Sequence, residues 1–412
     1  MQHALQLESA LPPAYRLSGD TPVYSPEPGP REQRLATGSP ISIENPSFTG
    51  LLRRSGNGIT VFLKNQDEAA QVPSYGRHTS IAGEIHLENT KGVASVTATL
   101  VGRLDITLGV VGGSEYALTT IVQPCWSTVD SVSCPSTLPF DITFPETFSG
   151  LDSEEQLPLP PSFDPAGDGF RIRDLYVRII YRLTVRVAKG KWRPQKICLY
   201  RLAIDVKYAP RARPAQSTPS TYPTISRAIN SIPEQWQQIG LNMPSKVPLE
   251  FASISCTLTV PAFRVFTKDE NIPFHLRLTS SQPSMTALLH PEHSESRGSP
   301  RAQDKRPNIR VYIKRQVVAN ERGVSLARSY DIGEGTLRSS PPEIREDTWA
   351  GEAVIEYEGE VRCEQTITVG GFDMGKLRAS DFMVLSIRPT ERATFSAFVE
   401  LVYAHPIRIV TG

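Results

Sequence analysis

The sharpest recognition pattern in this sequence is Pro12-Pro13-Ala14-Tyr15. Two adjacent prolines preset a polyproline II turn that stacks on the aromatic walls of a groove, while the tyrosine fills a neighbouring pocket. This is the pattern that WW domains bind, and it requires an accessible site. Because four-residue matches also arise by chance in proline-rich segments, the motif is either a WW-domain ligand or part of an inert tail.

A second pattern places three arginines on one face of an expected strand. Arg178, Arg182 and Arg186 share parity, opposite a set of apolar side chains in the same strand, 175–187. A row of guanidinium groups can hold phosphate on the tails of binding partners or on anionic lipid headgroups. The alternative is a solvated sheet face whose arginines pair with acids elsewhere in the fold.

Residue patterns for catalysis or metal binding are weak. The glycine-rich phosphate loops, Gly-x-Ser-x-Gly and His-Glu-x-x-His are all missing from the sequence. His290 and His293 lie beside Glu292, in a polar segment where such a pair is usually solvated. We therefore expect no catalytic activity, no cofactor and no metal. The competing interpretation is an enzyme whose site is assembled from scattered loop residues around a deep polar pocket.

The cysteines also argue against a metal site or a disulfide framework. They are odd in number and scattered, without Cys-x-x-Cys spacing, at Cys125, Cys134, Cys198, Cys256 and Cys363. We expect most of them to be small buried hydrophobic residues.

Length and charge set the broad class of the protein. The 412 residues suit two domains of roughly 150 to 170 residues each, with tails and linkers. The chain has 44 Lys and Arg against 43 Asp and Glu, and its basic stretch lacks an exposed aromatic series, so we do not expect nucleic-acid binding. No apolar run approaches the roughly 18 to 20 residues that cross a bilayer, and residues 1–13 do not resemble a secretion signal. We expect a cytoplasmic protein.

Alternation of apolar and polar residues predicts an all-β fold. In the stretch 96–108 one parity is apolar and the other mostly polar, the apolar members being Val96, Ala98, Leu100, Leu104, Ile106 and Leu108. A period of two indicates a sheet with one buried face and one solvent face. Similar patterns recur in residues 41–208 and 249–410, and Gly56-Asn57-Gly58 supplies turn chemistry between two of them.

Proline and serine content sets the expected boundaries. We expect a disordered Pro-rich tail at 1–40, a first β-sandwich at 41–209, a Pro/Ser/Thr-rich interdomain linker at 210–248, and a second β-sandwich at 249–412 with a disordered insertion at 280–308. Within the linker, Ser231-Ile232-Pro233-Glu234 has the spacing of a helix capping box and predicts a short helix there. Two sheet-rich halves without long amphipathic helices indicate tandem immunoglobulin-like β-sandwiches.

The order of several short motifs resembles the N-terminal domain of arrestins, particularly fungal α-arrestin-like proteins. The matching segments are Gly83-Glu84-Ile85-His86-Leu87-Glu88-Asn89, 96–104, 138–145, Pro160-Pro161-Ser162-Phe163, 181–187 and 406–411. The resemblance covers residues 41–412 apart from the insertion and is strongest in the first half. It implies an arrestin N-terminal-like sandwich followed by an arrestin C-terminal-like sandwich.

The resemblance also implies a function. Members of this family are non-catalytic adaptors that bind the cytoplasmic tails of membrane-protein cargo and recruit a HECT-type ubiquitin ligase for ubiquitin-dependent endocytosis or sorting. Pro12, Pro13 and Tyr15 match the motif that recruits the WW domains of such ligases, although family members often carry several copies after the second domain. We accordingly expect peripheral recruitment to the plasma membrane or endosomes. The alternative is a retromer-like or other arrestin-fold trafficking scaffold without ligase recruitment.

Overall fold

The computed structural model describes most of the chain from residue 50 onward. The described ranges are 50–109, 112–129, 133–151, 155–167, 169–170, 173–189, 198–214, 224–289, 308–340, 352–389 and 396–412. Pro12, Pro13 and Tyr15 lie outside them, as does the whole predicted tail. Residues 48–412 form one compact unit.

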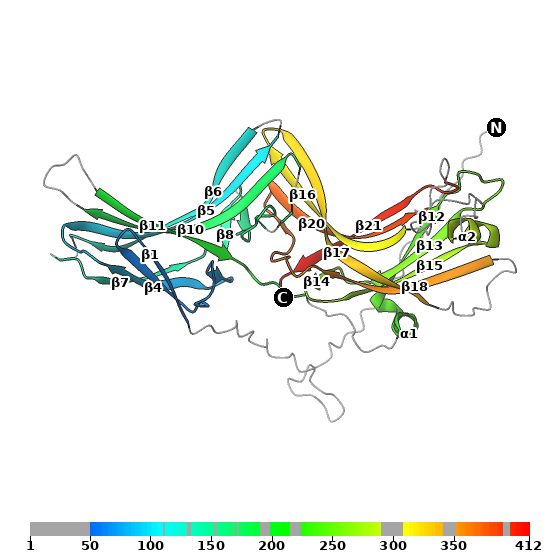
Figure 1. Cartoon of the computed structure of the whole chain (residues 1–412), viewed down its shortest axis with the longest axis horizontal. Coiled ribbons are helices and arrows are strands. Elements are labelled where there is room, and N and C mark those ends of the chain that lie inside the picture. The colour runs from blue at the N-terminus through cyan, green and yellow to red at the C-terminus, as the bar shows by residue number, and fades with distance from the viewer. Residues whose placement is uncertain are drawn as a thin grey trace, which may run out of the picture. The chain divides into compact units, whose positions relative to one another are not determined.

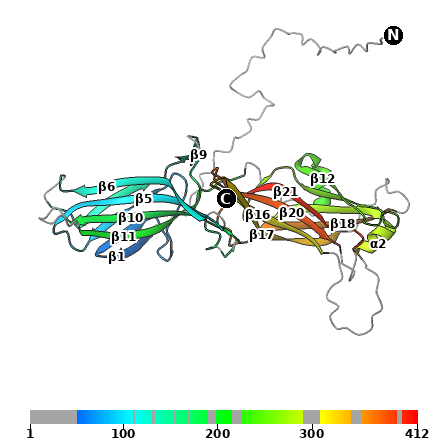
Figure 2. The ribbon, with the colours of Figure 1, turned by 90° about the horizontal axis from the view of Figure 1, so that it is seen from above.

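The first half contains two main sheets that share a core. Strands pair in the order β1-β2-β4-β7 in one sheet and β3-β11-β10-β5-β6 in the other (Figures 1 and 2). Two short strands, β8 and β9, form a separate hairpin. The bounds are β1 Leu51–Gly56, β2 Ile59–Lys64, β3 Ser74–Tyr75, β4 Ser80–Leu87, β5 Val93–Leu108, β6 Gly112–Ser127, β7 Thr137–Thr143, β8 Thr147–Ser149, β9 Gln156–Pro158, β10 Leu175–Lys189 and β11 Cys198–Tyr208.

The alternation in β5 produces the buried face that the sequence predicts. Each of the apolar residues on its even parity is fully buried, at 0% exposure: Val96, Ala98, Leu100, Leu104, Ile106 and Leu108. They pack in one cluster with Val61, Ile81 and Ile85 of the four-stranded sheet. The two sheets therefore enclose a single hydrophobic core between them, as in a β-sandwich.

The predicted turn between β1 and β2 is confirmed. Asn57 and Gly58 have φ angles of 55° and 72°, so both adopt the left-handed conformation of a two-residue hairpin turn. Asn and Gly tolerate this conformation better than other residues, which explains why the sequence signal was readable here.

The second half is one large sheet that folds over itself. Its strands pair in the order β12-β13-β15-β18-β17-β16-β20-β21-β14, and β19 adds to β20. Residues of β13 and β15 share a core with residues of β16 and β20. The bounds are β12 Trp236–Met243, β13 Ile254–Pro261, β14 Val265–Thr267, β15 Ile272–Ser281, β16 Asn308–Glu321, β17 Val324–Ser340, β18 Glu352–Cys363, β19 Phe372–Asp373, β20 Leu377–Arg388 and β21 Leu401–Val410.

Strand β17 joins the two layers of this sheet. Its first part pairs with β16 and its last part pairs with β18, and Ile332 is an extra residue in the ladder opposite Ile313 and Lys314. Figure 1 shows β17 as a long curved strand. A bulge of this kind bends a strand and increases its twist, which lets β17 pass from one layer to the other.

The structure differs from the predicted linker at 210–248. This segment contains the helix α1 (Ile225–Ser231), a 3-10 turn (Pro233–Gln235) and β12, which pairs with β13 over its whole length. Ser231 ends α1 instead of capping a helix after it, and Trp236 begins a strand. Ile239, Leu241 and Met243 alternate with other residues as in a strand. The high proline and serine content around them led to the prediction of a linker instead.

The predicted insertion at 280–308 also begins with ordered structure. Strand β15 continues to Ser281, and the helix α2 (Gln282–Leu289) buries Met285 and Leu288. Residues 290–307 lie outside the described ranges. Throughout those ranges the fold is all-β apart from α1, α2 and the 3-10 turn, and no described helix has the length and apolar character to span a membrane.

The two halves are connected by the polypeptide and also contact each other through side chains. Val317 and Ala319 of β16 and Leu377 of β20 belong to the core of the first half. Beside them the buried Glu321 carboxylate accepts hydrogen bonds from Ser114 Oγ at 2.9 Å and Tyr116 Oη at 2.7 Å. The Tyr116 hydrogen bond is the main cause that holds the pKa of Glu321 below its ordinary value.

Candidate binding face of the five-stranded sheet

The predicted arginine row lies on the outer face of β10. Leu183 and the other odd-numbered residues of the strand are buried against the core, while Arg178 and Arg182 are half-buried and Arg186 is exposed on the opposite side. The described helices α1 and α2 pack on strands of the second half. The outer face of β10 and its neighbours is therefore not covered by either helix.

Two of the three arginines have acidic partners. Arg178 Nε lies 2.9 Å from Asp164 Oδ2, and Arg182 Nε donates to Asp205 Oδ1 at 2.6 Å. The hydrogen bond to Asp205 is the main cause that raises the pKa of Arg182. Arg178 and Arg182 are thus paired with acids within the fold, as expected if this is a solvated sheet face. Anion binding by these two arginines stays a prediction.

Arg186 has a different neighbour. The β10–β11 register places it directly opposite Arg201, which is also exposed. On its other side, in β5, lies Thr97. The structure therefore brings Arg186 together with a second arginine rather than with an acid.

Sequence reasoning missed a further charged cluster on the same face. Arg103 of β5 lies 2.8 Å from Asp105 and 3.1 Å from Glu115 of β6. The parity of β5 carried a signal, since Arg103 and Asp105 both fall on its polar side. Asp105 and Glu115 are directly opposite each other in the β5–β6 ladder, and Arg103 contacts both carboxylates. Arg186 and Arg201 are likewise opposed like charges, but no oppositely charged side chain among the described residues pairs with them.

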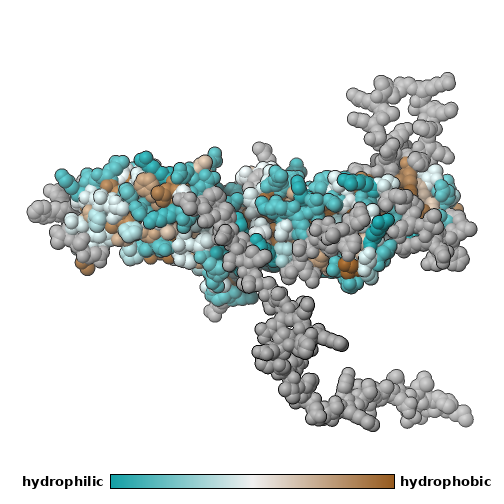
Figure 3. Space-filling model, turned by 90° about the horizontal axis from the view of Figure 1, so that it is seen from below, coloured by the Kyte–Doolittle hydropathy of each residue, from teal (hydrophilic) through white to brown (hydrophobic). Residues whose placement is uncertain are grey.

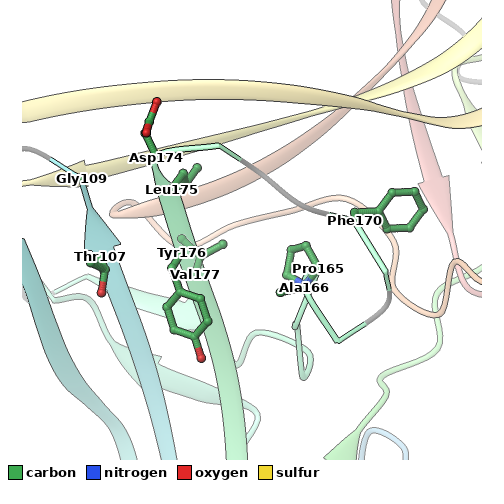
Figure 4. A pocket seen from close by; sticks show the side chains of 9 residues that line it. All are labelled: Thr107, Gly109, Pro165, Ala166, Phe170, Asp174, Leu175, Tyr176 and Val177. Carbon is green, nitrogen blue, oxygen red and sulfur yellow. The ribbon is translucent and has the colours of Figure 1, made fainter.

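A cavity of about 410 Å³ opens where β5 ends and β10 begins (Figure 4). It is lined largely by apolar groups, the residues being Thr107, Gly109, Pro165, Ala166, Phe170, Asp174, Leu175, Tyr176 and Val177. Figure 4 shows the Asp174 carboxylate pointing away from Tyr176, and this carboxylate lies 3.7 Å from Arg328. The described residues of the lining bring together no nucleophile with a neighbouring base.

Metal ligands do not gather in the described part of the chain either, where no group of three or more His, Cys, Asp or Glu residues could hold an ion. Cys134, Cys256 and Cys363 are buried and Cys125 is half-buried; all four are free thiols. Burial raises the pKa of Cys256 and of Cys363 to about 12, which makes these thiols poor ligands and poor nucleophiles.

Comparison with protein-family models gave no match, and comparison with curated proteins gave none. The arrestin-like interpretation therefore rests on the motifs in the sequence.

Proposed function

We propose that this chain is a non-catalytic adaptor with two arrestin-like β-sandwiches. It binds cytoplasmic tails of membrane proteins and recruits a HECT-type ubiquitin ligase through Pro12-Pro13-Ala14-Tyr15. The observation that carries the proposal is the outer face of the five-stranded sheet, which is charged and not covered by either described helix. A face of this kind suits reversible recognition of a polar partner better than catalysis.

Contacts among the motif segments support the arrestin-like arrangement. The Pro160-Pro161-Ser162-Phe163 loop lies against β10, where Tyr181 Oη donates to the Pro160 carbonyl at 2.6 Å. Phe163 forms a bridge with Ile179 in the same strand. Segments that were matched separately in the sequence thus come together in one place.

The surface on the side away from the five-stranded sheet is polar. Figure 3 views the molecule from below, opposite to Figure 2, and shows a mostly hydrophilic surface with hydrophobic residues in small separate areas. Large obligate interfaces are usually more apolar than this, so we assign the protein to transient associations, with recruitment to membranes through cargo.

The ligase link is tested with one substitution in the tail. Tyr15→Ala removes the side chain that fills the WW pocket, so we expect loss of WW-domain binding in titration calorimetry and slower ubiquitination of cargo in cells. The parent affinity should lie on the order of micromolar to tens of micromolar, since a short motif buries little surface. Tyr24→Ala, in the same tail without the preceding Pro-Pro, is the matched control.

Two outcomes separate the alternatives. If Tyr15→Ala and Tyr24→Ala bind WW domains and support ubiquitination as well as the parent, the ligase link is wrong and a retromer-like scaffold becomes the better interpretation. A pull-down from cells with residues 1–40 present and absent then identifies the partners of the remaining chain.

A further inference from the structure

We infer that Arg186 and Arg201 form a binding site for a single phosphate group. Both are exposed and directly opposed in the β10–β11 ladder. The inference goes beyond the proposed function by naming a chemical group that this part of the sheet face binds, and it depends neither on cargo binding nor on the ligase link.

The neighbours of this pair leave its charge unmatched. On the same face, Arg186 is flanked by Thr184 and Ala188 along β10 and by Thr97 across the ladder in β5, and Ala203 follows Arg201 on β11. The next acid along β11 is Asp205, which already holds Arg182 at 2.6 Å. Residues 190–197, which connect the two strands, contain no Asp or Glu. Among the described residues neither arginine has an ion-pair partner.

Like charges placed directly opposite in an antiparallel ladder destabilise the sheet. On the same face the other arginines are matched, Arg103 by Asp105 and Arg178 by Asp164. A phosphate dianion would remove the repulsion, because guanidinium groups bind phosphate oxygens in pairs of hydrogen bonds.

The surrounding acids limit the size of the ligand. Asp205, Asp105 and Glu115 lie on the same face and would repel a continuous anionic surface. A localised dianion meets two positive charges without reaching those carboxylates. The site is therefore suited to one phosphate monoester group, whether on a soluble small molecule or on the headgroup of a lipid.

The test compares thermal unfolding of the full chain in sodium phosphate and in sodium chloride at equal ionic strength and pH. We expect phosphate to raise the melting temperature of the parent by about 1 to 3 °C, as a ligand that binds only the folded state does. Arg186→Gln and Arg201→Gln should each abolish this rise. Arg103→Gln, which removes an acid-paired arginine from the same face, should keep it.

A second signature guards against variants that merely fold poorly. Because each Gln substitution removes a like-charge contact, Arg186→Gln and Arg201→Gln should melt about 1 °C higher than the parent in chloride. If phosphate stabilises parent and Gln variants equally, or if the Gln variants melt lower in chloride, the inference is overturned.

The source of the phosphate is resolved with two further probes. Binding of glycerol phosphate, measured by calorimetry and lost in Arg201→Gln, assigns the site to soluble phosphomonoesters. Sedimentation with vesicles containing a phosphatidylinositol phosphate, again lost in Arg201→Gln, assigns it to lipid. Equal binding to phosphatidylserine vesicles by parent and Arg201→Gln, with neither phosphomonoester bound, would show diffuse charge attraction and contradict the site. None of these readouts involves Tyr15, so their failure is separable from that of the ligase link.

Discussion

Leu100 and Thr99 are adjacent in β5 but differ sharply in what they contribute. Leu100 is fully buried between the two sheets, whereas Thr99 points to the opposite face. We expect Leu100→Ala to cost about 2 to 5 kcal/mol of unfolding free energy through lost burial and a cavity. Thr99→Ala should cost much less. Urea denaturation of both variants checks this, and equal costs would contradict the assigned faces.

His405 makes the stability of the second core depend on pH. It is 2% exposed, neither ring nitrogen has a hydrogen-bond partner among the described residues, and burial followed by the Arg264 charge lowers its pKa. The unfolded state therefore binds the proton more readily, and stability is lost as pH falls below about 6.5. His405→Leu removes the titrating group. The difference in urea midpoint between parent and variant should change between pH 8 and pH 5, in favour of the variant at low pH; a constant difference would refute this.

For single residues, the sequence predicted correctly which face of a strand a side chain lies on, but it did not predict which side chain it pairs with. The parity of Arg178, Arg182 and Arg186 correctly placed them on one side of β10. Their partners depend on strand register and on the Asp164 loop, which no local pattern encodes. The sequence alone could not predict that Arg186 lies opposite Arg201, because this depends on the register between β10 and β11.

Among the elements, β17 has a strict local requirement at one glycine. At Gly333, where the strand passes between layers, an added Cβ would collide with the Arg362 carbonyl oxygen and approach Cys363. Gly333→Ala should therefore cost about 1 to 3 kcal/mol of unfolding free energy, the range for forcing an extra group into a packed site. Gly240→Ala in β12 is the matched control, since nothing lies within 4 Å of its added Cβ. Similar denaturation midpoints for the two variants would contradict this, because they would show that the backbone around Gly333 shifts to accept a methyl group at little cost.

Elements with clean periodicity were predictable, and those that depend on long-range pairing were not. Strands β5 and β10 were identified from alternation over their buried faces. Strand β12 was missed because its exposed edge position leaves most of its residues only partly buried, and nearby prolines dominated the composition. The corner in β17 has no local signal beyond two glycines, since the layers it joins are set by its partners β16 and β18.

For the molecule as a whole, the buried Glu321 carboxylate couples the two halves. Tyr116 donates to it at 2.7 Å from the first half, and a hydrogen bond to a charged acceptor contributes about 1.5 to 3 kcal/mol. We expect Tyr116→Phe to lower the stability by that order and to separate the unfolding of the two halves into distinguishable steps. Tyr176→Phe serves as the control, because Tyr176 is exposed. Identical, single-step transitions in calorimetry for both variants would show that the contact couples nothing.

The position of β21 has a consequence for how the protein is made. It pairs with β20 on one side and with β14 on the other, and β14 precedes it in the sequence by more than a hundred residues. Leu377 and its neighbours meanwhile complete the first core. During synthesis, both β14 and β20 must wait with open edges until β21 leaves the ribosome, and open edges pair readily with other chains. The nascent polypeptide is thus exposed to aggregation until β21 has been synthesised and has paired with both edges.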